Sequence, residues 1–186
     1  MMDAKITKNI ISKPLIVYHG STFLFDNIEF NKGKPYKDFG KGFYVTKNRN
    51  HAINLAMRNK LIESKRGNSD VQAYLYTFEF NLDGVNNFKV KEFNKANLEW
   101  IQFVIANRKS RERTHEYEIV MGPTANDDTM SVINAYLDEL FGEIGSNIAL
   151  EALINRIKPD ALPYQIYFAS EEATKLLTQK CEVEIL

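Results

Sequence analysis

Two neighbouring stretches, Val17–Thr22 (VYHGST) and Tyr36–Thr46 (YKDFGKGFYVT), decide how the fold of this chain is interpreted. The first ends an apolar run, PLIVYHG, which is typical of a short buried strand. The second is a glycine-punctuated loop that leads into the aromatic strand GFYVT. Glycines beside aromatic residues let a flat or phosphorylated ligand come close to the backbone. The two stretches therefore predict a ligand-binding loop between two short strands.

The rest of the chain predicts helices and strands that do not alternate strictly. Helices are expected over residues 48–65, 94–109, 126–144, 146–158 and 171–177. Strands are expected over residues 14–20, 42–46, 71–80, 85–91, 117–123, 164–169 and 181–186. This order favours an α+β fold over a doubly wound parallel sheet, and the short aromatic strands favour packed antiparallel sheets. We expect one domain over residues 1–186, with residues 1–13 as a polar lead-in.

The composition argues against several classes of protein, among them dedicated nucleic-acid binders and disulfide-stabilised proteins. The 186 residues include 24 Lys plus Arg and 24 Asp plus Glu, so no net positive charge marks a dedicated nucleic-acid binder. Cys181 is the single cysteine, which rules out a disulfide within the chain and suits a reducing cytosol. Three scattered histidines with one cysteine make a poor metal site. We find no signal peptide or membrane-spanning run and expect a cytoplasmic protein.

Three motifs in this order resemble the diphtheria-toxin-like ADP-ribosyltransferase superfamily, which includes the poly-ADP-ribose polymerases. They are His19-Gly20-Ser21 at the exit of a strand, the loop Tyr36–Tyr44, and Gln165 at the start of the strand YQIYF. The resemblance is closest to an uncharacterised bacterial branch and covers most of residues 15–180. That branch shares DFGKGFY, a helix with Trp100, Phe103, Val104, Asn107 and Arg108, and a turn with Gly122, Pro123, Ala125, Asn126 and Asp127.

The resemblance implies two packed antiparallel sheets around an NAD cleft, flanked by the helices 48–65 and 94–109. It also implies NAD as co-substrate without a metal. His19, Tyr44 and Gln165 are the catalytic residues by this resemblance, and Gly20 binds the nicotinamide amide through its backbone. His19 binds a hydroxyl of the adenosine ribose, while Tyr44 and Tyr36 sandwich the nicotinamide. The implied cofactor-binding set is His19, Gly20, Ser21, Tyr36, Phe39, Gly40, Lys41, Gly42 and Tyr44.

Gln165 departs from the glutamate that well-known transferases carry at this position. The resemblance implies that this glutamate binds the 2′-hydroxyl of the nicotinamide ribose and stabilises the developing cation. An amide can bind the same hydroxyl, but it has no charge to stabilise that cation. Chain-forming polymerase activity is therefore not expected, whereas mono-ADP-ribosylation is. Asp38 is a candidate replacement carboxylate, although we interpret it as an ordinary loop residue.

Two groups of residues each allow more than one role. They are the turn at Asn126 and the charged residues Arg108 and Lys41. Asn126, Asp127 and Asp128 either cap the following helix and meet its dipole, or contact ribose, phosphate or acceptor. Arg108 and Lys41 suit the pyrophosphate, because their charged groups match phosphate oxygens. Alternatively, Arg108 is a solvated charge at a helix end.

The expected function is NAD-dependent mono-ADP-ribosylation of a macromolecular acceptor that the sequence does not identify. The resemblance implies a bacterial toxin or defence protein, with an antitoxin as partner and no membrane association. The alternatives are NAD hydrolysis, with water as acceptor, and a catalytically weak module that binds NAD, ADP-ribose or a protein. Gln165 favours the weak module, whereas His19, Tyr36 and Tyr44 favour the enzyme.

Overall fold

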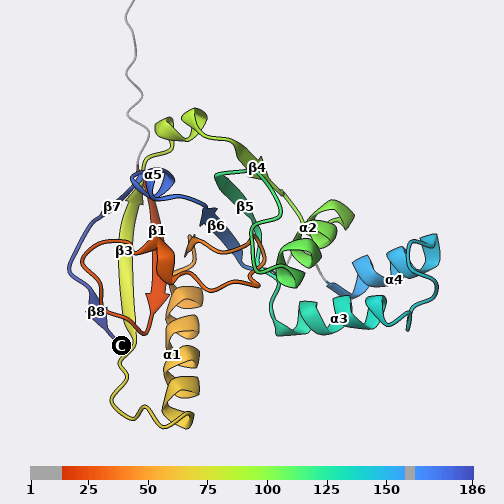
Figure 1. Cartoon of the computed structure of the whole chain (residues 1–186), viewed down its shortest axis with the longest axis horizontal. Coiled ribbons are helices and arrows are strands. Elements are labelled where there is room, and N and C mark those ends of the chain that lie inside the picture. Colours follow the sequence, from red (N-terminus) through yellow and green to blue (C-terminus); the bar gives the residue numbers. More distant parts are fainter. Residues whose placement is uncertain (1–13, 158–161) are drawn as a thin grey trace, which may run out of the picture.

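The computed structural model describes residues 14–157 and 162–186, and it has the predicted α+β class (Figure 1). The predicted lead-in, residues 1–13, lies outside the described residues. The strands are β1 (Leu15–Ser21), β2 (Phe43–Thr46), β3 (Tyr74–Phe80), β4 (Val90–Glu92), β5 (Ile119–Pro123), β6 (Tyr164–Phe168), β7 (Leu177–Gln179) and β8 (Glu184–Ile185). The helices are α1 (Arg49–Lys65), α2 (Leu98–Lys109), α3 (Asp127–Leu137), α4 (Asn147–Ile157) and α5 (Glu171–Thr174), with 3-10 turns η1 (Phe30–Lys32) and η2 (Asp83–Asn87).

The strands form one curled, mixed sheet, so the prediction of two separate antiparallel sheets was wrong. Strand order is β4-β5-β6-β2-β1-β3-β7, and β8 also pairs with β3. The β4–β5 pair is parallel, and every other strand pair is antiparallel. Hydrogen bonding continues from one edge to the other because β2 pairs with both β6 and β1.

The sheet is nevertheless nearly split between β1 and β2. Strand β1 pairs with β3 along its whole length, but with β2 only at Tyr18 and Thr46. Beyond this pair the contact between the two strands is a hydrogen bond from the His19 side chain of β1 to the Tyr44 carbonyl of β2. The two halves of the sheet therefore separate where β1 ends and β2 begins.

Helix α1 packs very closely on β1, and this contact selects small residues. Ala52 and Ala56 are its buried residues. A Cβ atom on Gly20 would lie 2.0 Å from the Ala52 carbonyl oxygen, which no side chain tolerates. The larger apolar residues Met57 and Leu61 are exposed, so the face of α1 that packs on β1 carries alanines instead.

Polar caps define where the helices begin. The side chains of Asn48, Asn97, Asn126 and Ser170 each accept a hydrogen bond from the backbone of the first turn that follows. Two predicted helices end earlier than expected. The helix predicted over 126–144 stops at Leu137, since the chain reverses near Glu139 (φ 58°). The helix predicted over 171–177 stops at Thr174 because Leu177 begins β7 and pairs with β3.

Two hydrophobic clusters lie against the sheet. One packs α2, α3 and α4 around completely buried Trp100 and Phe39, and the other contains Val17, Tyr76 and Phe168. Figure 1 shows α3 and α4 side by side at the end of the molecule away from β1 and α1. In the described part of the chain, none of the helices has the length and apolar character needed to cross a membrane.

Candidate functional site

A cavity of about 540 Å³ opens where β1 and β2 separate. Its walls come from the end of β1, the loop over residues 22–42, the start of β2, one face of α1 and the turn over residues 124–126. This volume is in the range of small-molecule sites. Six of the predicted cofactor-binding residues line it, namely His19, Gly20, Ser21, Tyr36, Gly42 and Tyr44, and so does Gln165.

His19 is held as a neutral base. Its Nδ1 lies 2.7 Å from the Tyr44 carbonyl oxygen, so Nδ1 carries the proton and donates it. Burial lowers the pKa of His19 to about 4, although that hydrogen bond opposes the shift. The ring stacks on Phe43 with centroids 4.4 Å apart. Nε2 therefore remains an acceptor for a hydroxyl group in the cavity.

Two tyrosines present aromatic surface to the cavity in different ways. The Tyr44 hydroxyl donates to the Gly40 carbonyl at 2.6 Å and accepts from the Phe39 amide at 3.2 Å, which secures the loop. Burial, with the Asp38 charge adding to it, raises the pKa of Tyr44 well above its usual value. Tyr36 is 53% exposed and has a φ of 60°. This left-handed backbone is unfavourable for a side chain as large as tyrosine and is a feature often found at functional sites.

The glycines of the two motifs have structural reasons beyond ligand access. Position 20 needs a glycine because α1 packs so closely that a side chain would collide with it. The Gly20 backbone also lines the cavity. A Cβ on Gly42 would lie 2.3 Å from the Tyr167 ring, so this glycine lets the loop pack on β6. Gly40 has a φ of 95°, which favours glycine without any ligand. The sequence interpretation, in which these glycines make room for a flat ring, therefore explains only part of the pattern.

Asp38 is the centre of a buried network, and its interpretation as an ordinary loop residue was wrong. It is 4% exposed, and its Oδ1 accepts from Arg108 Nε at 2.6 Å. Its Oδ2 accepts from the Ala125 amide at 2.9 Å and from Gln165 Nε2 at 2.8 Å. The Arg108 guanidinium also donates to the Ala125 carbonyl. Arg108 is thus not a solvated charge at a helix end, because it compensates a buried carboxylate, and it also lines the cavity.

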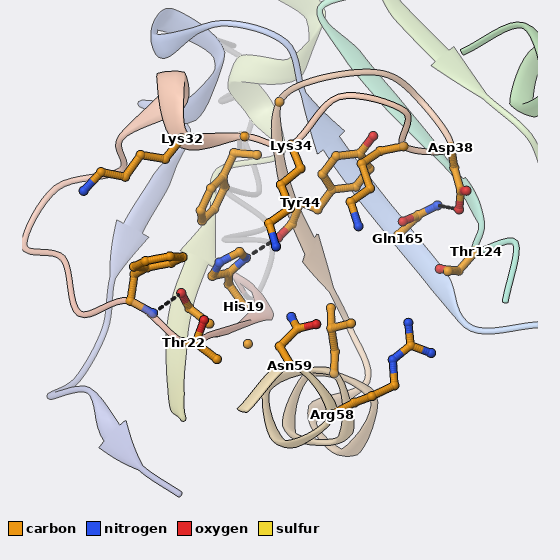
Figure 2. A pocket seen from close by; sticks show the side chains of 18 of the residues that line it. His19, Thr22, Lys32, Lys34, Asp38, Tyr44, Arg58, Asn59, Thr124 and Gln165 are labelled. Carbon is orange, nitrogen blue, oxygen red and sulfur yellow. Dashed lines mark hydrogen bonds between the residues drawn. The ribbon is translucent and has the colours of Figure 1, made fainter. Parts of the chain in front are cut away.

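This network fixes the orientation of the Gln165 amide. Because a carboxylate can only accept, the amide nitrogen faces Asp38, and it also lies 3.4 Å from the Pro123 carbonyl. The amide oxygen then points toward the cavity, as Figure 2 shows. Gln165 is 8% exposed, so this orientation is held in a largely buried position. The site presents an acceptor oxygen to a ligand, with a negative charge directly behind it.

Three predicted cofactor-binding residues do not line the cavity. Phe39 is completely buried in the core below the loop, and Gly40 is buried as well. Lys41 is not among the lining residues, and its carbonyl accepts a hydrogen bond from Tyr167 at 3.0 Å. At these three positions the loop motif therefore serves the packing of the loop on the core.

The turn before α3 caps that helix, as one of the two alternatives expected, and it also reaches the wall of the cavity. Asn126 lines the cavity, and its side chain also caps α3 by accepting from the Thr129 amide at 2.8 Å. Asp128 is exposed and does not line the cavity. Asp127 opens α3, but its side chain lies outside the described part of the structure.

Several cavity residues were missed in the sequence. His51, Asn54 and Arg58 follow one another at helical spacing on α1, so a polar stripe was available as a signal. Lys34 and Lys37 come from the loop, and Figure 2 shows Lys34 and Arg58 extending toward the same opening from opposite sides. Thr124 lies beside Gln165 and Asp38 (Figure 2) and had no motif to mark it. Within residues 14–157 and 162–186, no cluster of His, Cys, Asp or Glu is suited to a metal ion.

Comparison with known proteins assigns a family but not an activity. A family model described as a protein of unknown function (DUF3990) matches residues 15–179, so the chain belongs to this family. The match begins with β1 and ends with β7, and it therefore includes every residue that lines the cavity. No curated protein and no solved structure matches the chain.

Proposed function

We propose that this member of the DUF3990 family is a mono-ADP-ribosyltransferase that binds NAD in the cavity, cleaves the nicotinamide–ribose bond and transfers ADP-ribose to a macromolecule. The observation that carries the proposal is the convergence of His19, Tyr44 and Gln165 on one cavity from β1, β2 and β6. These three residues are far apart in the sequence. They are also the ones for which the resemblance to ADP-ribosyltransferases implies a catalytic role.

The chemistry of the cavity suits this reaction. Cleavage of the bond develops positive charge on the ribose, as in glycoside hydrolysis. The Gln165 amide oxygen faces that sugar, and the Asp38 carboxylate lies 2.8 Å behind its nitrogen. A preorganised dipole backed by a buried charge stabilises a developing cation without reorganisation. Asp38 thus supplies, through Gln165, part of the charge that a glutamate would supply directly.

The remaining contacts of the ligand follow from the same geometry. Neutral His19 accepts a ribose hydroxyl at Nε2, and the Tyr36 and Tyr44 rings hold the nicotinamide, with offset stacking worth about 0.5–1.5 kcal/mol. Lys34, Lys37 and Arg58 line the opening, where cations suit a diphosphate. Arg108 lines the cavity as well, whereas Lys41, which had also been expected there, does not.

A catalytically weak NAD-binding module is the second candidate, and one observation favours it. Arg108 neutralises Asp38 through a 2.6 Å ion pair, so the charge behind Gln165 is partly compensated. Measurement of nicotinamide release separates the transferase, simple NAD hydrolysis and the binding module. Release in the presence of cell extract supports the transferase, release without an acceptor supports NAD hydrolysis, and binding without release supports the module.

Tyr36 offers the cleanest test of NAD binding. Tyr36→Gly removes the ring and relieves the left-handed backbone, so the free protein should keep its thermal stability. NAD should raise the melting temperature of the parent, because it binds only the folded state. We expect this rise to be largely lost in Tyr36→Gly and kept in the control Tyr36→Phe. A rise of equal size in Tyr36→Gly would exclude the ring from the site, and no rise in the parent would refute NAD as the ligand.

A further inference from the structure

The hydroxyl of Thr124 is buried but makes no hydrogen bond to the described part of the chain. Among the residues that the structure describes, Thr124 Oγ1 is the one buried side-chain oxygen or nitrogen without a hydrogen-bond partner. A buried hydroxyl without a partner destabilises the folded state, so most such groups are paired. Thr124 also lines the cavity. An unpaired polar atom at the wall of a binding cavity indicates a group that a ligand satisfies.

The backbone around Thr124 is fixed on both sides. The Thr124 amide donates to the Pro163 carbonyl at 2.7 Å. The Pro123 carbonyl accepts from the Trp100 indole at 3.0 Å, and the Ala125 amide donates to Asp38 at 2.9 Å. The hydroxyl is therefore held in place by neighbours whose own polar groups are satisfied. Such rigid support is what a preorganised binding group requires.

Gln165 provides the second half of the site. Its strand pairs directly with the segment before Thr124, since Gly122 lies opposite Gln165 in the β5–β6 register. Figure 2 shows the Thr124 and Gln165 side chains next to each other at the same end of the cavity. Gln165 offers an acceptor oxygen there, and Thr124 offers a hydroxyl that can donate. Together they match a group that donates one hydrogen bond and accepts another.

We propose that Thr124 is a substrate-binding residue that, with Gln165, clamps the 2′-hydroxyl of the ribose next to the nicotinamide. The sugar hydroxyl donates to Gln165 Oε1 and accepts from Thr124 Oγ1. A phosphate does not fit this position, because it carries only acceptors toward Gln165 and would approach the buried charge of Asp38. The assignment rests on the proposed NAD-binding function.

The free protein gives a test that needs no ligand. Thr124→Val keeps the shape of the side chain and removes the unsatisfied hydroxyl, so the melting temperature should rise by about 2–4 °C. Thr46→Val is the matched control, because the buried Thr46 hydroxyl donates to the Tyr164 carbonyl at 2.7 Å. Its melting temperature should fall. A fall of similar size in Thr124→Val would mean that the hydroxyl already has a structural partner, and the proposal would be overturned.

Ligand binding gives the second test. The affinity of Thr124→Val for NAD should fall about two- to tenfold, as for the loss of one neutral hydrogen bond. An NAD analogue that lacks the 2′-hydroxyl of the nicotinamide ribose should bind the parent and Thr124→Val equally, because the contact is then missing from both. Parent-like NAD affinity in the variant would overturn the role of Thr124 alone. A parent that does not bind NAD would overturn the proposed function and this assignment with it.

Discussion

Replacing Gln165 by glutamate tests the buried network directly, because the new carboxylate would face that of Asp38. The two side chains now lie 2.8 Å apart. Two carboxylates at that separation repel by about 6 kcal/mol at an effective dielectric constant of about 20. Arg108 forms an ion pair with Asp38 on the side away from residue 165 through Oδ1, whereas Gln165 contacts Oδ2. We therefore expect the introduced glutamate to keep its proton in the folded protein, with a pKa well above its usual value of about 4.3.

A raised pKa makes the stability of Gln165→Glu depend on pH. Below pH 4.3 or so the introduced glutamate is protonated in both states, and the variant resembles the parent. Above that value the unfolded chain loses the proton while the folded chain keeps it. The free energy of unfolding should then fall, relative to the parent, by about 1.4 kcal/mol per pH unit, or about 2.7 kcal/mol between pH 5 and pH 7. Urea unfolding of the variant and the parent at pH 5 and pH 7 measures this difference in stability. The titration of His19 cancels in the comparison, because both proteins contain His19.

The exchange variant Asp38→Asn with Gln165→Glu is the matched control. It keeps one amide and one carboxylate in contact and moves the negative charge to the cavity side. We expect its stability relative to the parent to vary little between pH 5 and pH 7, and its nicotinamide release at pH 7 to exceed that of Gln165→Glu alone. If Gln165→Glu shows no relative loss of stability as the pH rises, Asp38 does not hold a charge against residue 165, and the reasoning is refuted.

Three further predictions concern the walls of the cavity. Since burial lowers the pKa of His19 to about 4, the parent should lose up to about 3 kcal/mol of stability as the pH falls from about 6.5 to about 4, and His19→Asn should remove this loss in acid unfolding curves. Gly20→Ala should lower the free energy of unfolding by about 3 kcal/mol or more, because the new Cβ would lie 2.0 Å from the Ala52 carbonyl; an unchanged melting temperature would contradict the packing of α1. Tyr44→Phe loses the 2.6 Å hydrogen bond to Gly40, so it should cost about 1–2 kcal/mol and speed amide exchange in the loop, while NAD affinity changes little because the ring remains.

Local sequence patterns predicted most elements, because hydrophobic spacing and polar caps act over a few residues. The helices expected to begin at residues 48 and 171 do begin there or one residue later, and His19, Tyr36, Tyr44 and Gln165 lie at one cavity as expected. The errors arose where distant segments override a local preference. Leu177 continues a helical pattern in the sequence but pairs with β3 in the fold.

The role of Asp38 could not be found in the sequence. Its partners, Arg108 and Gln165, are 70 and 127 residues away, and no spacing rule links them. An acidic residue in a loop is normally solvated, and only the fold shows that this one is buried with an arginine against it. Thr124 was missed for a related reason. An unsatisfied hydroxyl is a property of its surroundings and leaves no mark on the residue type.

The separation of β1 from β2 has a consequence for how such a cavity changes during evolution. Where two strands part, their facing main-chain groups form an internal edge that is hidden from other molecules, which avoids the aggregation hazard of an outer edge. Gly20 has no side chain, so the atoms that it contributes to the cavity wall belong to the main chain. Every amino acid sequence that keeps this fold keeps those atoms. The cavity can therefore retain part of its recognition surface while the side chains around it change to suit new ligands.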